Sequence, residues 1–199
     1  MRTVTALIEE SHGRARIELD GAPWRTVPVA VVVAAGLRVG GPLDRERARD
    51  LGRALRRARA FDTAGRALAH RDRSRADLAA QLERRGIAPD ATKEVVTAFE
   101  RFGFVDDARL ATSRVRVLAE RGYGDAAIRF DLEHKGLAAD EVEAAIGLLD
   151  DEEARARALV ASARDRLKAV RRLSSKGFSD DVVGAVLESV QAETPGESD

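Results

Sequence analysis

LAAQLERRGIAPDATKEVVTAF (78–99), IRFDLEHKGLAADEVEAAIGLL (128–149) and AVRRLSSKGFSDDVVGAVLESV (169–190) are three stretches of this chain that follow one pattern. Each carries a glycine at the same place, namely Gly86, Gly136 and Gly177. A leucine stands four residues before the glycine, a basic residue directly before it, and an apolar residue directly after it. Internal similarity at a regular period is typical of stacked helical repeats.

The shared glycine predicts the turn of a helical hairpin. A helix that ends at the basic residue leaves the glycine in the left-handed C′ position, where it avoids the penalty that a Cβ would bring. The preceding leucine and the following apolar residue are then the two positions that touch in a Schellman motif. Asp90, Asp140 and Asp180 come next, and acidic residues suit the first turn of a second helix.

A further helix is predicted before each hairpin, at residues 62–71, 106–122 and 150–167. The helices then form three repeats of three, at residues 62–105, 106–149 and 150–191. One repeat cannot bury its apolar face alone, so we expect the repeats to stack into an elongated, curved module. The polar residues 192–199 are expected to form a disordered tail.

Residues 1–61 predict a small β element followed by helices. Thr3–Glu9 and Arg14–Leu19 alternate apolar and polar residues, and a third strand is expected at Trp24–Val27. The apolar run Val29–Ala35 is interpreted as a short helix, and Gly40-Gly41-Pro42 as a break. Asp44 then caps a long arginine-rich helix that ends near Phe61. The fold class is therefore mainly α, with a small N-terminal β-hairpin or sheet element.

The composition excludes several kinds of chemistry. The 199 residues, a length typical of one or two domains, contain no cysteine, so disulfides, thiolate metal sites and cysteine nucleophiles are ruled out. The three histidines are far apart, and no Gly-Lys pair for a P-loop exists. We therefore expect no cofactor, no metal and no enzymatic activity. The seven-residue apolar run is too short to span a bilayer, and a soluble, cytoplasmic protein, most simply a monomer, is expected.

Three acidic pairs could suggest metal binding or acid catalysis: Asp106-Asp107, Asp150-Asp151 and Asp180-Asp181. Each begins or precedes a predicted helix, where a carboxylate is favourable in any case. We therefore interpret the pairs as caps.

Charge is balanced overall and uneven along the chain. The sequence has 34 basic and 34 acidic residues, but residues 1–60 carry an excess of positive charge and residues 122–199 an excess of negative charge. A general nucleic-acid binder is usually basic throughout, whereas a polarised chain suits a partner of mixed surface potential. The second helices of the hairpins are acidic, which disfavours reading of DNA bases by these hairpins.

Basic residues gather on the first hairpin helices and on the helices before them. The candidate partner-binding or DNA-binding residues are Arg71, Arg73, Arg75, Arg84, Arg85, Arg121, Arg129, Lys135, Arg164, Arg166, Lys168, Arg171, Arg172 and Lys176, together with Tyr123. Arg85, Lys135 and Lys176 could instead only complement helix C-termini. The arginines between Arg45 and Arg75 could form a contact surface or simply a solvated helix face.

Tyr123 lies between two glycines, where it could anchor the turn or serve as an interface residue. Trp24 is expected to cover the small sheet. Phe99, Phe102, Phe104, Phe130 and Phe178 are expected in the core.

Four segments resemble the RecX family, bacterial regulators of the RecA recombinase: ALAHRDRSRADLAAQL (67–82), FGFVDDARLA (102–111), RGYGDAAIRFDLEHKG (121–136) and RRLSSKGF (171–178). The resemblance extends over about residues 62–191, and residues 1–61 are similar to the extended forms of the family. Leu110 stands where the family commonly has an aromatic residue, and the arginine load is heavy.

The resemblance implies three tandem three-helix repeats that bind RecA and its filament on single-stranded DNA. It also implies restraint of ATP hydrolysis, strand exchange and coprotease activity, and hence of recombination, DNA repair and the SOS response. Occupation of the filament groove and capping of the filament both stay open, as does direct DNA contact. Two alternatives are a DNA-binding helical regulator and a helical-repeat scaffold for an unrelated partner.

Overall fold

The computed structural model describes residues 2–193 and divides them into two compact units. The first unit contains residues up to 71 and 79–98, and the second contains residues 72–78 and those from 99 onwards. The chain passes between the units after Arg71, within α3 (Arg75–Arg84) and again within α4 (Pro89–Arg101). Residues 194–199 of the predicted tail lie outside the described residues.

A four-stranded antiparallel sheet opens the first unit, in the order β3-β2-β1-β4. Its strands are β1 (Arg2–Glu10), β2 (Arg14–Leu19), β3 (Ala22–Pro28) and β4 (Pro42–Leu43). The three predicted strands are confirmed. The segment expected only as a break also supplies β4, because Pro42 and Leu43 pair with the start of β1.

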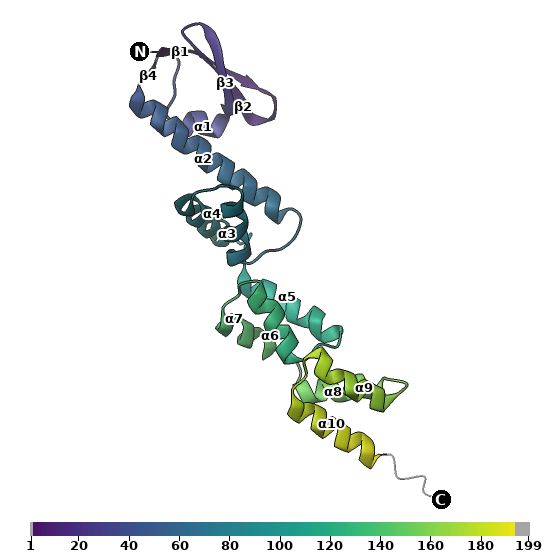
Figure 1. Ribbon diagram of the computed structural model, residues 1–199. Coiled ribbons are helices and arrows are strands. Elements are labelled where there is room, and N and C mark those ends of the chain that lie inside the picture. The colour runs from purple at the N-terminus through teal and green to yellow at the C-terminus, as the bar shows by residue number, and fades with distance from the viewer. Residues whose placement is uncertain (1, 194–199) are drawn as a thin grey trace, which may run out of the picture. The chain divides into compact units, whose positions relative to one another are not determined.

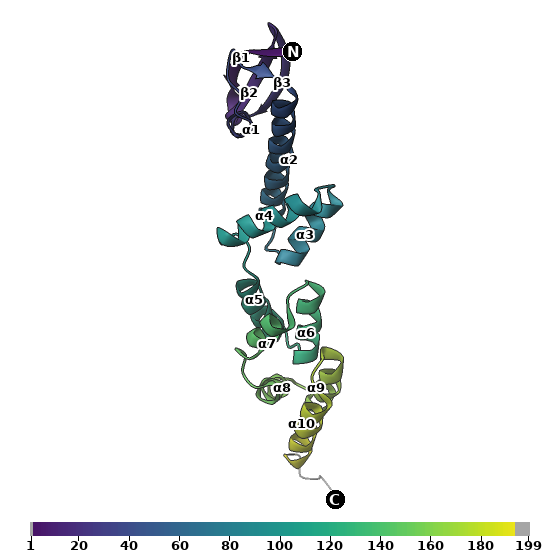
Figure 2. The same cartoon turned by 90° about the vertical axis from the view of Figure 1, so that its left-hand side faces the viewer.

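One face of the sheet is covered by helices (Figure 1). The alternating residues Val4, Ile17 and Val27 are buried from three strands and pack with Val31 of α1 (Val29–Ala34) and Leu51 of α2 (Arg45–Leu68). Figure 2 shows α1 lying close to the first part of α2. Alternation along each strand therefore places one apolar face toward the two helices.

The arginine-rich helix is longer than expected. We predict one helix that ends near Phe61 and another at residues 62–71, but α2 continues without a break to Leu68. The Asp44 carboxylate caps it by accepting the Arg47 N–H at 2.8 Å. No new helix begins at residues 62–63. The Thr63 hydroxyl donates to the Arg59 carbonyl at 2.7 Å, within the same helix, and the backbone hydrogen bonds of α2 continue past it. The prediction of two separate helices is therefore wrong.

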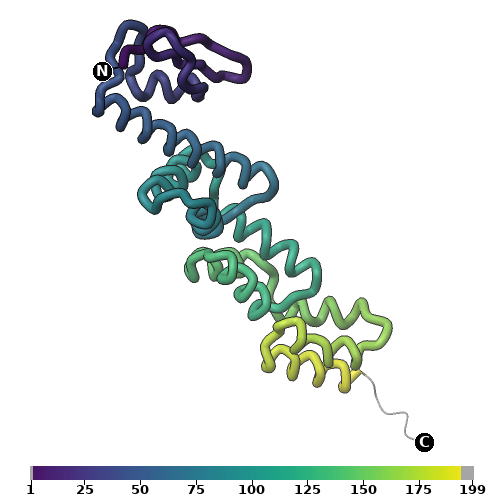
Figure 3. The backbone as a smooth tube through the Cα atoms, turned by 45° about the horizontal axis from the view of Figure 1, so that its top comes forward, coloured from purple at the N-terminus to yellow at the C-terminus, as the bar shows by residue number. Residues whose placement is uncertain are grey.

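The second unit is built from helices. They are α5 (Asp107–Glu120), α6 (Asp125–His134), α7 (Ala139–Ile146), α8 (Glu152–Ala161), α9 (Arg166–Leu173) and α10 (Asp180–Ala192). The tube in Figure 3 follows them as successive helical turns from green to yellow. α5, α6 and α7 enclose one apolar core around Ile128 and Leu132, and α8, α9 and α10 enclose another around Leu173 and Val186.

The helix expected at residues 150–167 is shorter in the structure. It stops at Ala161, and α9 starts at Arg166, because the Asp165 carboxylate accepts the Lys168 N–H at 2.9 Å and caps a new helix. The mainly helical fold with a small N-terminal sheet is as predicted.

The three hairpin turns have the geometry of the Schellman motif. Gly86, Gly136 and Gly177 have φ of 76°, 74° and 81°. In each turn the N–H of the following apolar residue donates to the carbonyl of the leucine four before the glycine, at 3.1, 3.3 and 3.2 Å. The repeated sequence pattern thus corresponds to a repeated hydrogen-bond pattern.

Candidate functional site

Two junctions within the second unit decide which charged residues are available for a partner. The first joins residues 72–78 to the α5–α7 bundle. The buried carboxylate of Asp107 accepts the Arg75 backbone N–H at 2.9 Å and its Nε at 3.0 Å. Arg75 also pairs with Glu100 at 3.1 Å and with Glu141 at 2.7 Å. These carboxylates, Asp107 above all, raise the pKa of Arg75.

The second junction repeats this backbone arrangement between α6 and the α8–α10 bundle. Glu152 accepts the Asp125 backbone N–H at 2.7 Å, as Asp107 does for Arg75. Asp107 and Glu152 are each the first residue of their own helix. Asp107 therefore caps the start of α3, and Glu152 caps the start of α6. Asp106 and Asp151, one residue earlier, cap their own helices. The second junction carries the reverse charge, since Asp125 pairs with Arg155.

The glycines of the two later hairpins have a steric role at these junctions. A Cβ on Gly136 would lie 2.6 Å from the Cβ of Ala76, and one on Gly177 would lie 2.5 Å from the Cβ of Ala127. The Gly177 carbonyl also accepts the Ala126 N–H at 3.1 Å. A Cβ on Gly86 would meet nothing within 4 Å. Close approach of two backbones therefore requires glycine at the junctions, in addition to the positive φ.

Removing the buried acceptor should weaken the first junction. We expect Asp107→Asn to lower the free energy of unfolding by about 1–3 kcal/mol, since it removes the charge opposite Arg75 and weakens a cap. Urea unfolding of the variant measures the loss. Asp106→Asn is the matched control, because Asp106 is exposed and caps only its own helix. Equal losses in the two variants would contradict the cross-junction role.

A bidentate ion pair joins α5 to α6 and predicts a pH dependence. Arg114 donates to both oxygens of Asp131 at 2.8 Å, which holds the pKa of Asp131 below its usual value of 3.8. Because the folded-state pKa is lowered, the stabilisation is complete above the unfolded value and declines as pH falls through the folded pKa. The stability difference between the wild type and Asp131→Asn should therefore shrink below pH 3.8. Urea unfolding at neutral and acidic pH tests this, and a constant difference would contradict it.

Several of the predicted partner-binding residues are engaged inside the chain. Arg75 is held by its carboxylates, and the largely buried Arg73 pairs with Asp77 at 2.8 Å. Further intramolecular contacts are Arg129 with Glu143, Arg166 with Glu193, and the Lys176 ammonium over the Tyr123 ring at 4.1 Å. The other candidates lie in two sets, and Arg71 among them also has an intramolecular partner. In the first unit, Arg71, Arg84 and Arg85 are exposed.

In the second unit the remaining set is Arg121, Arg164, Lys168, Arg171 and Arg172, and we call it the basic surface. All five side chains are exposed, and none makes an ion pair with another described residue. Four belong to α9 or the loop before it. Arg121 lies near the turn that follows α9, because its backbone carbonyl accepts a hydrogen bond from the Lys176 ammonium at 3.4 Å. Lys135, on the α6 turn, is half-buried.

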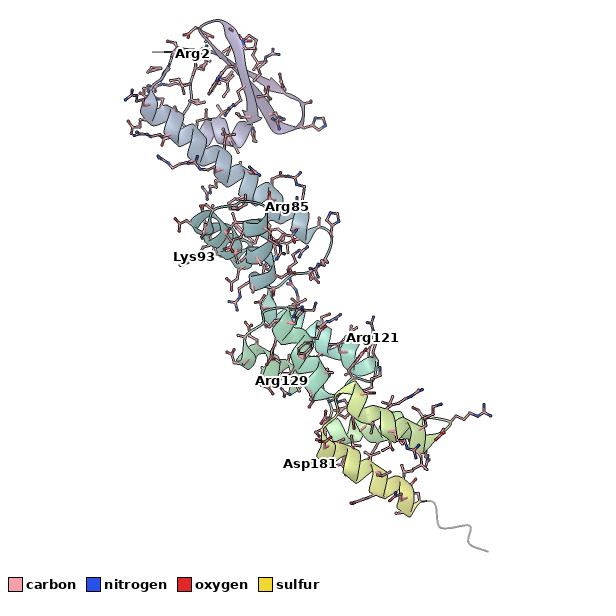
Figure 4. The ribbon with its side chains drawn as sticks, in the orientation of Figure 1. Arg2, Arg85, Lys93, Arg121, Arg129 and Asp181 are labelled. Atoms are coloured by element: carbon pink, nitrogen blue, oxygen red, sulfur yellow. The ribbon has the colours of Figure 1, made fainter. Side chains whose placement is uncertain are left out.

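Exposed acidic residues of the same unit lie both beside the basic surface, at Glu120 and Asp165, and away from it. Exposed carboxylates occur on α7 and α10, at Asp140, Glu143, Asp180, Asp181 and Glu188. Figure 4 shows Arg121 and Asp181 on opposite sides of the second unit. Exposed basic residues of α9 and exposed acidic residues of α7 and α10 therefore lie on different helices of the second unit.

The sequence interpretation missed two arginines on α5. Arg109 and Arg116, with Thr112 and Ser113, lie along one open face of this helix. Their spacing of seven residues, which places both on one helix face, was the available signal.

Three phenylalanines expected in the core are exposed instead. Phe102 and Phe104 are each 64% exposed and Phe130 is 71% exposed, whereas Phe178 is buried. Phe102 lies under the Arg101 guanidinium at 5.3 Å, and Phe130 stacks on His134 at 6.2 Å. Phe130 follows the buried Ile128 by two helical positions, which turns it away from the core. Trp24, expected to cover the sheet, is 36% exposed and contacts Arg25.

Clusters of metal-ligating side chains and membrane-spanning helices are both absent from the described part of the chain. Among residues 2–193 no group of three or more His, Asp and Glu residues is placed to hold a metal ion. No helix in that range is long and apolar enough to cross a membrane.

Comparisons with known proteins agree with the sequence resemblance. Residues 106–146 match the family model described as RecX, second three-helix domain. The regulatory protein RecX of Pseudomonas fluorescens is 33% identical over 130 residues, which cover 60% of this chain and 84% of that protein. The regulatory protein RecX of Leptothrix cholodnii is 39% identical over 129 residues, which cover 60% of this chain and 82% of that protein.

A solved structure shows the same fold. The crystal structure of a regulatory protein RecX superposes with a TM-score of 0.78 at 21% identity, over 94% of this chain and all of that one. Sequence identity over most of two relatives, the family model and this shared fold point the same way. The chain belongs to the RecX family of regulatory proteins.

Proposed function

We propose that this chain regulates the RecA recombinase by binding RecA and its filament on single-stranded DNA. Membership of the RecX family is the observation that carries this proposal. Bound chain would restrain ATP hydrolysis, strand exchange and coprotease activity, and thereby recombination, DNA repair and the SOS response. The action is protein recognition by a cytoplasmic monomer, and no covalent bond is made or broken.

We propose the basic surface as the part of the second unit that meets the filament. Its side chains are exposed and lack carboxylate partners, so binding does not first have to break internal ion pairs. A filament on DNA presents acidic side chains and phosphates at regular intervals, to which such a surface is complementary. Arg71, Arg84 and Arg85 are a second candidate contact from the first unit. Occupation of the groove between RecA protomers and capping of the filament end are both compatible with this surface.

Binding measured with and without RecA separates the proposal from its alternatives. Labelled single-stranded DNA is titrated with the chain, first alone and then coated with RecA and a non-hydrolysable ATP analogue, and fluorescence anisotropy is recorded. We expect saturable binding to the coated DNA at concentrations where bare DNA does not bind. Equal binding to bare DNA, with a steep salt dependence, would instead favour a DNA-binding regulator. Binding to neither would leave a scaffold for another partner.

A further inference from the structure

An open groove in the first unit is distinct from the proposed RecA-binding surface. It runs between α2 on one side and α1 with the ends of β2 and β3 on the other, and its volume is about 870 Å³. That volume falls within the range of pockets that hold ligands, roughly 300–1,000 Å³. The groove belongs wholly to the first unit, whereas the basic surface belongs to the second.

The floor of the groove is apolar. Pro28 and Val31 line it from the sheet side, and Leu55, Ala58 and Phe61 line it from α2. The apolar residues of α2 thus have two environments. Leu51 is buried under the sheet, whereas Leu55 and Ala58 line the groove and are only half-buried. An apolar floor of this kind is filled well by aliphatic side chains and poorly by phosphates.

The rim of the groove is basic and only partly neutralised. Arg57 pairs with Glu94 at 2.6 Å, and Asp62, the acidic residue that lines the groove, pairs with Arg66. Arg14 and Arg59 differ from Arg57, because the guanidinium group of each donates to a backbone carbonyl and not to a carboxylate. Arg14 donates to Thr26 at 3.0 Å, and Arg59 to Arg85 at 3.5 Å. Two guanidinium groups therefore retain their charge and most of their donors for an incoming carboxylate.

We propose that this groove is a docking site for a short acidic, amphipathic peptide segment of a partner protein. Aliphatic side chains of the segment would lie on the floor between Val31 and Leu55, and its carboxylates would meet Arg14 and Arg59. This is the helix-in-groove mode of recognition, in which apolar anchors supply contact area and charges at the rim fix the orientation. The inference does not depend on RecA binding, because neither the basic surface of the second unit nor the second candidate contact at Arg71, Arg84 and Arg85 lines this groove.

Selection of peptides tests the chemistry of the occupant directly. The full chain is immobilised and used to select from a library of short random peptides displayed on phage. We expect the enriched sequences to combine Asp or Glu with Leu, Ile, Val or Phe. Enrichment of basic or uncharged sequences, or no enrichment above an unrelated protein, would overturn the proposal.

Matched variants then locate the binding site. A selected peptide is labelled, and its affinity for the folded full chain is measured by fluorescence anisotropy. Arg14→Glu with Arg59→Glu should weaken binding about a hundredfold, close to tenfold for each reversed charge, and Ala58→Leu should weaken it by filling the floor. Arg56→Glu and Ala48→Leu are the controls, because these exposed residues of α2 do not line the groove.

The outcomes distinguish the proposal from other occupants. Unchanged affinity in the groove variants, or an equal loss in the controls, would overturn it. So would a self-associating chain that Ala58→Leu converts to a monomer in sedimentation equilibrium, because the occupant would then be a second copy. RecA binding through the basic surface should stay intact in the groove variants, so failure of this proposal and failure of the proposed function are separable.

Discussion

Gly177→Ala is expected to lower the free energy of unfolding by about 2–5 kcal/mol. An alanine forced into the left-handed region costs roughly 1–2 kcal/mol, and an extra methyl in a close-packed contact costs roughly 1–3 kcal/mol more. The methyl group would lie 2.5 Å from the Cβ of Ala127, and the neighbouring backbone carries two cross-junction hydrogen bonds. Relief of the clash therefore requires α6 and the α9–α10 turn to move apart.

Gly86→Ala is the matched control for this prediction. Gly86 has the same role in its own hairpin and nearly the same φ, but its added Cβ meets nothing within 4 Å. Its cost should therefore be the backbone penalty alone, about 1–2 kcal/mol. Urea unfolding gives the total loss in each variant. Hydrogen exchange locates it, because only Gly177→Ala should speed exchange at the amides of Gly124 and Ala126. Equal losses, or unchanged exchange at these amides, would contradict the junction geometry.

Reversal of charge on the basic surface is expected to weaken filament binding by at least about a hundredfold. The variant combines Arg121→Glu, Lys168→Glu, Arg171→Glu and Arg172→Glu. Each reversal replaces an attraction with a repulsion, and a loss of about 1.4 kcal/mol for each of two residues already gives that factor. Fold should be preserved, because none of these side chains makes an ion pair with another described residue. The anisotropy assay with RecA-coated DNA measures the change.

Two further variants control for the total charge of the chain. Substitution of Arg121, Arg171 and Arg172 by lysine keeps the charge and should retain most of the binding. Reversal of Arg45, Arg49 and Arg56 on α2 changes the net charge in the same direction, by three reversals instead of four, and should leave binding nearly intact. If the α2 variant loses as much affinity as the variant of the basic surface, the assignment of the surface is wrong.

Local sequence signals predicted most of the architecture. The glycine, the leucine four before it and the apolar residue after it define a turn within a few residues, so the hairpins follow from local physics. The alternation in Arg14–Leu19 likewise predicts a strand. The length of α2 was not predictable from Asp62 and Thr63 alone, because a cap residue inside a helix can satisfy its side chain without ending the helix.

The candidate site was less predictable, because its limits are set by contacts that are distant in sequence. Arg75 resembles its basic neighbours until Asp107, Glu100 and Glu141 are placed around it. Lys176 is similarly indistinguishable from Lys168 until Tyr123 lies under its ammonium group. Exposure of Phe130 also depends on which face of α6 packs on α5 and α7. Composition supplies the candidates, and only the tertiary contacts show which of them are free to bind.

Regulation of RecA by this chain is tested by the ATPase activity of the cognate RecA on single-stranded DNA, measured while the chain is titrated from far below to above the RecA concentration. We predict inhibition by the wild type and its loss in the variant of the basic surface. Inhibition far below stoichiometry would indicate capping of the filament, and inhibition only near stoichiometry would indicate occupation of its groove. An ATPase rate that stays unchanged at every ratio would contradict the proposal that this chain regulates RecA.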